Sequence, residues 1–113
     1  MKLIICGGRN YHFTESDIQI LNDLHRKHKI TEVVSGACRG ADQEGECWAK
    51  LNDIPVKQFM PAWDDKGSAA GPIRNQAMAN YAEACICFPG GHGTQDMKRR
   101  AEEKGLITFE VEE

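Results

Sequence analysis

The sequence predicts an α/β domain in which a parallel sheet is covered by helices on both faces. Short apolar runs alternate with longer amphipathic runs, and this alternation is typical of βα units. The most glycine-dense stretches directly follow apolar runs, as loops at the ends of parallel strands often do. The length of 113 residues is that of one ordinary domain. We therefore expect residues 1–113 to form a single three-layer domain.

The first half of the chain predicts three strands and two helices. Lys2–Cys6 is an apolar run that we interpret as the first strand. Glu15–His28 carries its apolar residues along one stripe, and Thr14 precedes it as an expected N-cap. The remaining elements of this half are strands at Thr31–Ser35 and Pro55–Met60 and a helix at Ala41–Asn52.

The second half predicts two strands and two helices. Pro61–Gly71 is polar and contains Gly67, Ser68 and Gly71, so we expect a mobile loop rather than a regular element. Pro72 suits the first turn of a helix, because its missing N–H is not needed there. Ala84–Phe88 is apolar throughout, as a central parallel strand should be. The expected elements are helices at Pro72–Ala82 and Thr94–Lys104 and strands at Ala84–Phe88 and Leu106–Val111.

Right-handed crossovers favour the strand order 3-2-1-4-5 for these five strands. In such a sheet the winding reverses between strands 1 and 4, and a ligand crevice opens at their carboxyl ends. The loops at that point are Gly7–Asn10 and Pro89–Thr94. The pattern therefore predicts a binding site formed by these two loops.

Charge and hydropathy exclude several classes of partner. The net charge is −3, from 14 Lys+Arg and 17 Asp+Glu, so the chain lacks the overall positive field that holds a nucleic acid. The longest apolar run, Ala84–Pro89, is far shorter than the ~20 residues that cross a bilayer. No secretion signal is recognisable at the N-terminus. We expect a cytoplasmic protein with no membrane or nucleic-acid partner.

The five cysteines do not form a known metal-binding pattern. They are odd in number and have no CxxC spacing, and Cys85 and Cys87 lie in an apolar stretch. We interpret them as buried reduced thiols, and we expect no metal, no disulfide framework and no cofactor.

The loop Pro89–Thr94 has the composition of a phosphate cradle. Gly90, Gly91 and Gly93 let a phosphate approach the main chain, and Thr94 opens a helix whose free N–H groups favour an anion. His92 lies inside this loop and could donate a hydrogen bond to the phosphate, although a solvent-facing turn residue is an equal alternative. Glycine also serves any tight strand-to-helix turn, which is the alternative interpretation of the loop.

Arginines gather near the same edge of the predicted sheet. Arg74 stands in the first turn of a helix, where the dipole disfavours a cation unless an anion compensates it. We interpret it as a ligand contact, the alternative being an exposed arginine paired with Glu83 or Asp42. Asp42 begins another helix, where it could bind ribose hydroxyls, assist the departure of a base, or serve the helix dipole alone. The predicted ligand-binding residues are Gly7, Gly8, Arg9, Gly36, Arg39, Asp42, Arg74, Asn75, Pro89, Gly90, Gly91, His92, Gly93 and Thr94.

Four segments together resemble the SLOG superfamily, a Rossmann-like group that includes the LOG nucleotide phosphoribohydrolases and the Smf/DprA proteins. The chain looks most like its small YspA-like members of unknown function. The matching segments are Cys6–Tyr11, Val34–Asp42, Ala70–Met78 and Phe88–Thr94. Because these segments follow one another in order over nearly the whole chain, their combination is specific.

The resemblance implies a nucleotide-type ligand, with its phosphate at Pro89–Thr94 and Arg74 at the position of the arginine that LOG enzymes use at the scissile ribose. The LOG pattern PGGxGTxxE ends in a glutamate implicated in cleavage of the N-glycosidic bond, and Met97 occupies that position here. Methionine carries no charge and moves no proton. Asp96 is adjacent, but one step along a helix turns a side chain by about 100°, so it does not simply replace the glutamate.

We therefore expect a protein that binds a phosphorylated ribonucleoside or an ADP-ribose-like molecule, as a sensor or a sequestering protein. The alternative is a hydrolase of N-glycosidic or phosphate bonds in such a ligand, with Arg74, Asp42 and Asp96 as candidate catalytic residues. A weaker alternative is a DprA-like module that binds single-stranded DNA. The resemblance also implies a homodimer, because members of the superfamily often pair through helices.

Overall fold

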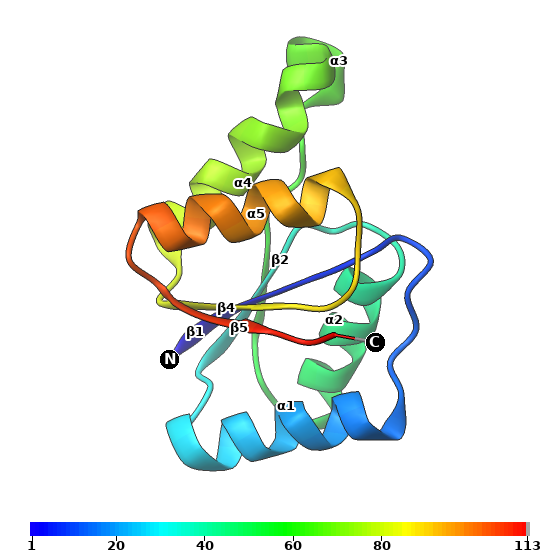
Figure 1. Ribbon diagram of the computed structural model, residues 1–113, viewed down its shortest axis with the longest axis vertical. Helices are drawn as coiled ribbons and strands as arrows, with labels where there is room; N and C mark the ends of the chain where they lie inside the picture. The colour runs from blue at the N-terminus through cyan, green and yellow to red at the C-terminus, as the bar shows by residue number, and fades with distance from the viewer. Residues whose placement is uncertain (113) are drawn as a thin grey trace.

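The computed structural model describes residues 1–112 and contains one five-stranded parallel sheet (Figure 1). The strand order is β3-β2-β1-β4-β5, as the sequence predicts. The strands are β1 (Lys2–Cys6), β2 (Glu32–Ser35), β3 (Val56–Gln58), β4 (Ala84–Cys87) and β5 (Ile107–Glu110). The helices are α1 (Glu15–His28), α2 (Ala41–Leu51), α3 (Trp63–Lys66), the 3₁₀ turn η1 (Gly67–Ala69), α4 (Ala70–Tyr81) and α5 (His92–Glu103).

Helices cover both faces of the sheet, and the alternation along β1 divides the core in two. Leu3 and Ile5 face α1 and α2, where they pack with Leu21 and Trp48. The intervening residues Ile4 and Cys6 face α4 and α5, where they pack with Met78 and Met97. Figure 1 shows α1 and α2 below the sheet and α4 and α5 above it. The predicted fold class is confirmed.

Helix α1 shows how the local sequence determines where a helix begins. The hydroxyl of Thr14 accepts a hydrogen bond from the Asp17 N–H, and the Asp17 carboxylate accepts one from the Thr14 N–H. This capping box satisfies backbone groups that a helix otherwise leaves unpaired. Leu21, on the inner face of the helix, is fully buried.

The segment expected to be a loop, Pro61–Gly71, contains helical turns instead, so that expectation was wrong. The N–H groups of Asp65 and Lys66 donate to the Ala62 carbonyl, and no residue of α3 or η1 is buried. A helical turn held by local hydrogen bonds does not require an apolar stripe, which explains why the sequence pattern missed it. In Figure 1 this segment extends away from the rest of the molecule above α4.

Two helix starts also lie earlier than expected. Helix α4 begins at Ala70, so Pro72 falls inside its first turn, where the proline is tolerated. Helix α5 begins at His92, inside the glycine loop. Among the described residues, no helix is both long and apolar enough to span a membrane.

Candidate functional site

A cavity of about 380 Å³ lies at the carboxyl ends of β1 and β4, where the sequence analysis places the crevice. This volume is within the usual range of small-molecule sites, about 300–1,000 Å³. Its walls include nine of the predicted residues: Gly7, Gly8, Arg9, Asp42, Arg74, Asn75, Gly91, Gly93 and Thr94. The structure therefore brings the loops after β1, β2 and β4 and the start of α4 around one space.

Several glycines hold these loops in close contact with one another. The Gly8 N–H donates to the Pro89 carbonyl at 2.8 Å, which joins the two central loops. Gly40 has a φ of +80°, and a Cβ there would lie 2.3 Å from the Gly8 carbonyl oxygen. A Cβ on Gly90 would lie 2.2 Å from Oγ1 of Thr94. These positions therefore need glycine for packing, whether or not a ligand binds.

Gly91 and Gly93 are different, because the fold itself leaves room for a side chain at both positions. A Cβ added to either residue meets no atom within 4 Å, and neither has a positive φ. Both residues line the cavity. Their small size therefore keeps open a space beside the backbone.

The start of helix α5 exposes unpaired backbone donors to this space. Gly91 is the N-cap of the helix and supplies no side-chain hydrogen bond. Within residues 1–112, the N–H groups of His92, Gly93 and Thr94 have no acceptor. Helix α1, in contrast, has a complete capping box. Unpaired N–H groups at a helix start favour an anion.

Arg74 is fixed at the rim of the cavity by the loop after β2. Its Nε donates to Oδ1 of Asn75 at 2.9 Å, and its Nη1 donates to the carbonyl oxygens of Gly36 and Phe59. No described residue accepts a hydrogen bond from Nη2. The guanidinium is thus held in position while it retains a donor.

Asn75 connects Arg74 to the start of α5. Its side chain is buried, and Nδ2 donates to the Gly93 carbonyl at 3.3 Å and to Oδ2 of Asp96 at 3.0 Å. Hydrogen bonds through Asn75 therefore connect the arginine on α4 to the first turn of α5.

Asp42 is a buried carboxyl group in the cavity wall. It is only 7% exposed, and its Oδ2 accepts a hydrogen bond from the Cys38 N–H at 3.3 Å. Burial raises the pKa of Asp42 to about 6, although this hydrogen bond and the charge of Arg74 oppose the rise. Asp42 can therefore exchange a proton near neutral pH.

Asp96, the other candidate carboxylate, lies outside the cavity wall and is held by three side chains. It accepts hydrogen bonds from Asn75, Arg99 and Arg100 at 2.9–3.0 Å. Burial raises the pKa of Asp96, but these three hydrogen bonds outweigh that effect and bring the pKa below its usual range. Its position indicates that it orients Asn75.

The other predicted residues surround the cavity without lining it. Gly36 and Pro89 accept hydrogen bonds that hold the loops, Gly90 packs against Thr94, and His92 and Arg39 are exposed. Four residues of the wall were not among the predicted ligand-binding residues: Cys6, Cys38, Met78 and Met97. Cys6, Met78 and Met97 belong to the apolar core beneath the cavity, and of these only Met97 had a signal in the sequence, because it stands at the position of the LOG glutamate.

A doubly wound parallel sheet with a ligand-sized cavity at its switch point defines a Rossmann-like protein. Within that class, the chain belongs to the YspA, cpYpsA-related SLOG family, whose model matches residues 1–65. It is also similar to the Gene 61 protein of Mycobacterium phage D29, with 30% identity over 114 residues that cover 93% of this chain and 91% of the phage protein. No solved structure matches the chain. The predicted resemblance is confirmed, and family membership suggests a nucleotide-related protein.

Proposed function

We propose that this protein binds a nucleotide or nucleotide-derived ligand, such as a phosphorylated ribonucleoside or an ADP-ribose-like molecule. The phosphate occupies the space beside Gly91 and Gly93 at the start of α5, and Arg74 binds the adjoining ribose or phosphate. The observation that carries this proposal is that Gly91 and Gly93 border a cavity although nothing in the fold excludes a side chain from either position.

The local charge supports an anionic ligand even though the whole chain is acidic. Arg9 and Arg74 both line the cavity, next to the unpaired N–H groups of α5. Backbone N–H groups and guanidinium groups are the donors that proteins use for phosphate. The net charge of −3 therefore does not describe this edge of the sheet.

Binding without cleavage fits the chemistry of the wall best. Met97, which stands where LOG enzymes have a glutamate, is buried and lines the cavity. Its thioether transfers no proton. The protein then acts as a sensor or sequestering protein for its ligand.

Asp42 favours a second candidate function, hydrolysis of the N-glycosidic bond. It lies in the cavity wall, and its pKa of about 6 lets it hold a proton for a departing base near neutral pH. Formation of free base would identify this activity, and Asp42→Asn should abolish it.

Calorimetry and thermal unfolding with AMP and ADP-ribose test the proposal, with chromatography of each mixture to detect cleavage. A ligand concentration of about 100 times the dissociation constant should stabilise the folded protein by about 2.7 kcal/mol. Arg74→Ala should remove this stabilisation, whereas Arg26→Ala, on the exposed surface of α1, should retain it. Binding that is unchanged in Arg74→Ala and in Gly91→Val would place the site elsewhere.

We also propose that the protein forms a homodimer through the α3–α4 region. Three large apolar side chains are exposed there: Met60, Trp63 and Ile73, at 73%, 48% and 52%. A dimer that covers them is compatible with an open nucleotide cavity, because none of the three lines it. Sedimentation equilibrium of wild type and Ile73→Glu tests this proposal, and a monomeric wild type contradicts it.

A further inference from the structure

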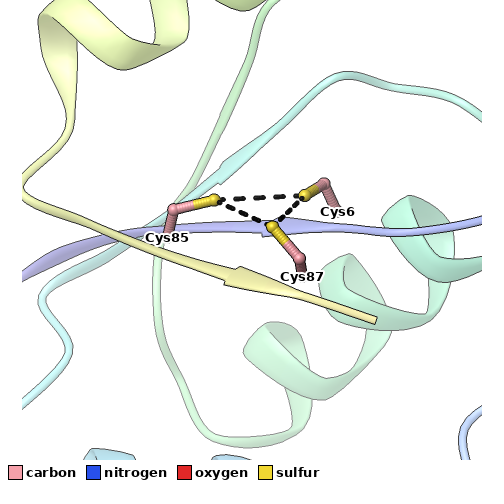
Figure 2. A group of neighbouring side chains, drawn as sticks. All are labelled: Cys6, Cys85 and Cys87. Carbon is pink, nitrogen blue, oxygen red and sulfur yellow. Dashed lines mark hydrogen bonds between the residues drawn. The ribbon is translucent and has the colours of Figure 1, made fainter. Parts of the chain in front are cut away.

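Three cysteine thiols form a compact cluster beneath the cavity floor. The Sγ of Cys6 lies 3.5 Å from that of Cys87 and 4.0 Å from that of Cys85, and the Cys85 and Cys87 sulfurs are 3.6 Å apart. Figure 2 shows the three side chains pointing toward one another from two adjacent strands. All three are buried and reduced. We call them the three-thiol cluster.

The strand register brings the three sulfurs together. Cys6 on β1 is paired with Cys87 on β4, and Ile4 is paired with Cys85. Side chains two residues apart in a strand share a face, so Cys85 and Cys87 both lie beside Cys6 on the face covered by α4 and α5. The sheet itself therefore holds the sulfurs in place.

The spacing of the sulfurs matches that of metal-bound thiolates. A Zn–S bond of about 2.3 Å with tetrahedral angles places two bound sulfurs about 3.8 Å apart. The three observed separations lie on either side of this value. An ion could thus bind all three sulfurs with shifts of a few tenths of an ångström.

We propose that the three-thiol cluster binds a thiophilic divalent cation of the Zn²⁺ class, with three thiolate ligands from Cys6, Cys85 and Cys87. Each thiol releases its proton to solvent as it binds. Thiolate ligands select such soft or borderline ions over Mg²⁺ and Ca²⁺, which require oxygen ligands. The cluster adjoins the proposed nucleotide cavity through Cys6, but the proposal rests on the sulfur geometry and not on nucleotide binding.

The cavity supplies an entry path and room for a fourth ligand. Cys6 is 7% exposed and lines the cavity, whereas Cys85 and Cys87 lie deeper. Cys6 is therefore the ligand nearest the cavity, through which an ion and a fourth ligand such as water would reach the cluster. An open fourth position distinguishes reactive zinc sites from closed structural ones.

Metal binding by the full-length, reduced, metal-free protein tests the proposal. Zn²⁺ is titrated against a chromophoric chelator, and Co²⁺ is added separately, because sulfur-to-cobalt charge transfer reports thiolate ligands directly. The expected result is one ion per chain together with a charge-transfer band. Cys87→Ser should weaken Zn²⁺ binding by roughly 100-fold or more, since even indirect partners of a metal ligand account for 10–100-fold.

The exposed Cys47 on α2 provides a matched control, and Cys47→Ser should bind Zn²⁺ as wild type does. Cys85→Ala serves as a second cluster variant, and circular dichroism verifies that each variant is folded. Zn²⁺ should also raise the unfolding temperature of the wild type and of Cys47→Ser, but not that of the two cluster variants. Absence of Zn²⁺ binding by the reduced wild type, or equal loss in Cys47→Ser, overturns the proposal and leaves the nucleotide site unaffected.

Discussion

Asp42→Asn should stabilise the protein at high pH, because the fold buries a carboxyl group that becomes charged there. The side chain is 7% exposed and has a pKa of about 6 in the folded protein, against an ordinary value of 3.8. Asparagine has nearly the same shape and can still accept the hydrogen bond from the Cys38 N–H through its side-chain oxygen. The substitution therefore removes the charge and retains the packing.

The size of the effect follows from the difference between the two pKa values. About two pKa units at 1.36 kcal/mol each amount to about 3 kcal/mol. Because the folded pKa is raised, the folded state binds the proton more tightly than the unfolded chain does. This contribution is fully present below the unfolded pKa and is lost as the pH rises through about 6. Asp42→Asn should thus match wild type near pH 4 and exceed its stability by up to about 3 kcal/mol at pH 8.

Urea unfolding at pH 5 and pH 8 measures this difference, with the fluorescence of buried Trp48 among the signals of unfolding. The difference in the free energy of unfolding between Asp42→Asn and wild type should grow by at least about 1 kcal/mol from pH 5 to pH 8. Asp64→Asn, at an exposed position on α3, should show no such growth. An advantage that is equal at pH 5 and pH 8 would refute the assignment of the raised pKa to Asp42.

Gly90→Ala should destabilise the fold by about 1–3 kcal/mol in urea, because its Cβ would lie 2.2 Å from Oγ1 of Thr94, whereas Gly91→Ala should have no such effect. Gly91→Val should abolish the stabilisation by ADP-ribose in thermal unfolding while the free protein loses less stability than Gly90→Ala does, and equal losses of stability in the variants at both glycines would contradict this distinction. Thr14→Ala should cost about 1 kcal/mol in urea by removing the cap of α1, with no change in ADP-ribose affinity by calorimetry. Leu21→Ala should cost about 2–5 kcal/mol, because it opens a hole in the core between α1 and the sheet.

The parallel sheet could be predicted from sequence because several rules of local structure agree on it. Lys2–Cys6 and Glu15–His28 have the bounds that their patterns predict, since apolar runs and a threonine cap mark them. Helix α3 could not be predicted, because local hydrogen bonds such as those to Ala62 form it and none of its residues is buried. Pattern analysis detects the elements that the core stabilises.

The position of the cavity was also predictable, but the roles of its glycines were not. Gly90 and Gly91 are neighbours of the same residue type, yet one is packed against Thr94 and the other faces open space. Only the three-dimensional packing separates a glycine that the fold requires from one at which the fold leaves room for a side chain. The role of Asp96 could not be predicted either, because only the structure shows the three side chains that donate hydrogen bonds to its carboxylate.

The three-thiol cluster shows which arrangement of cysteines motif spacing does not detect. A CxxC motif identifies ligands that lie close in sequence, but Cys6 is about 80 residues from its partners, and adjacent strands bring them together. The predicted strand order places β1 beside β4, and alternation places Cys85 and Cys87 on one face. Whether Cys6 shares that face depends on the register, because a slip of one residue exchanges the faces of a strand. The register therefore decides whether the three cysteines are separate core residues or one cluster, and the pairing of Cys6 with Cys87 brings their sulfurs together.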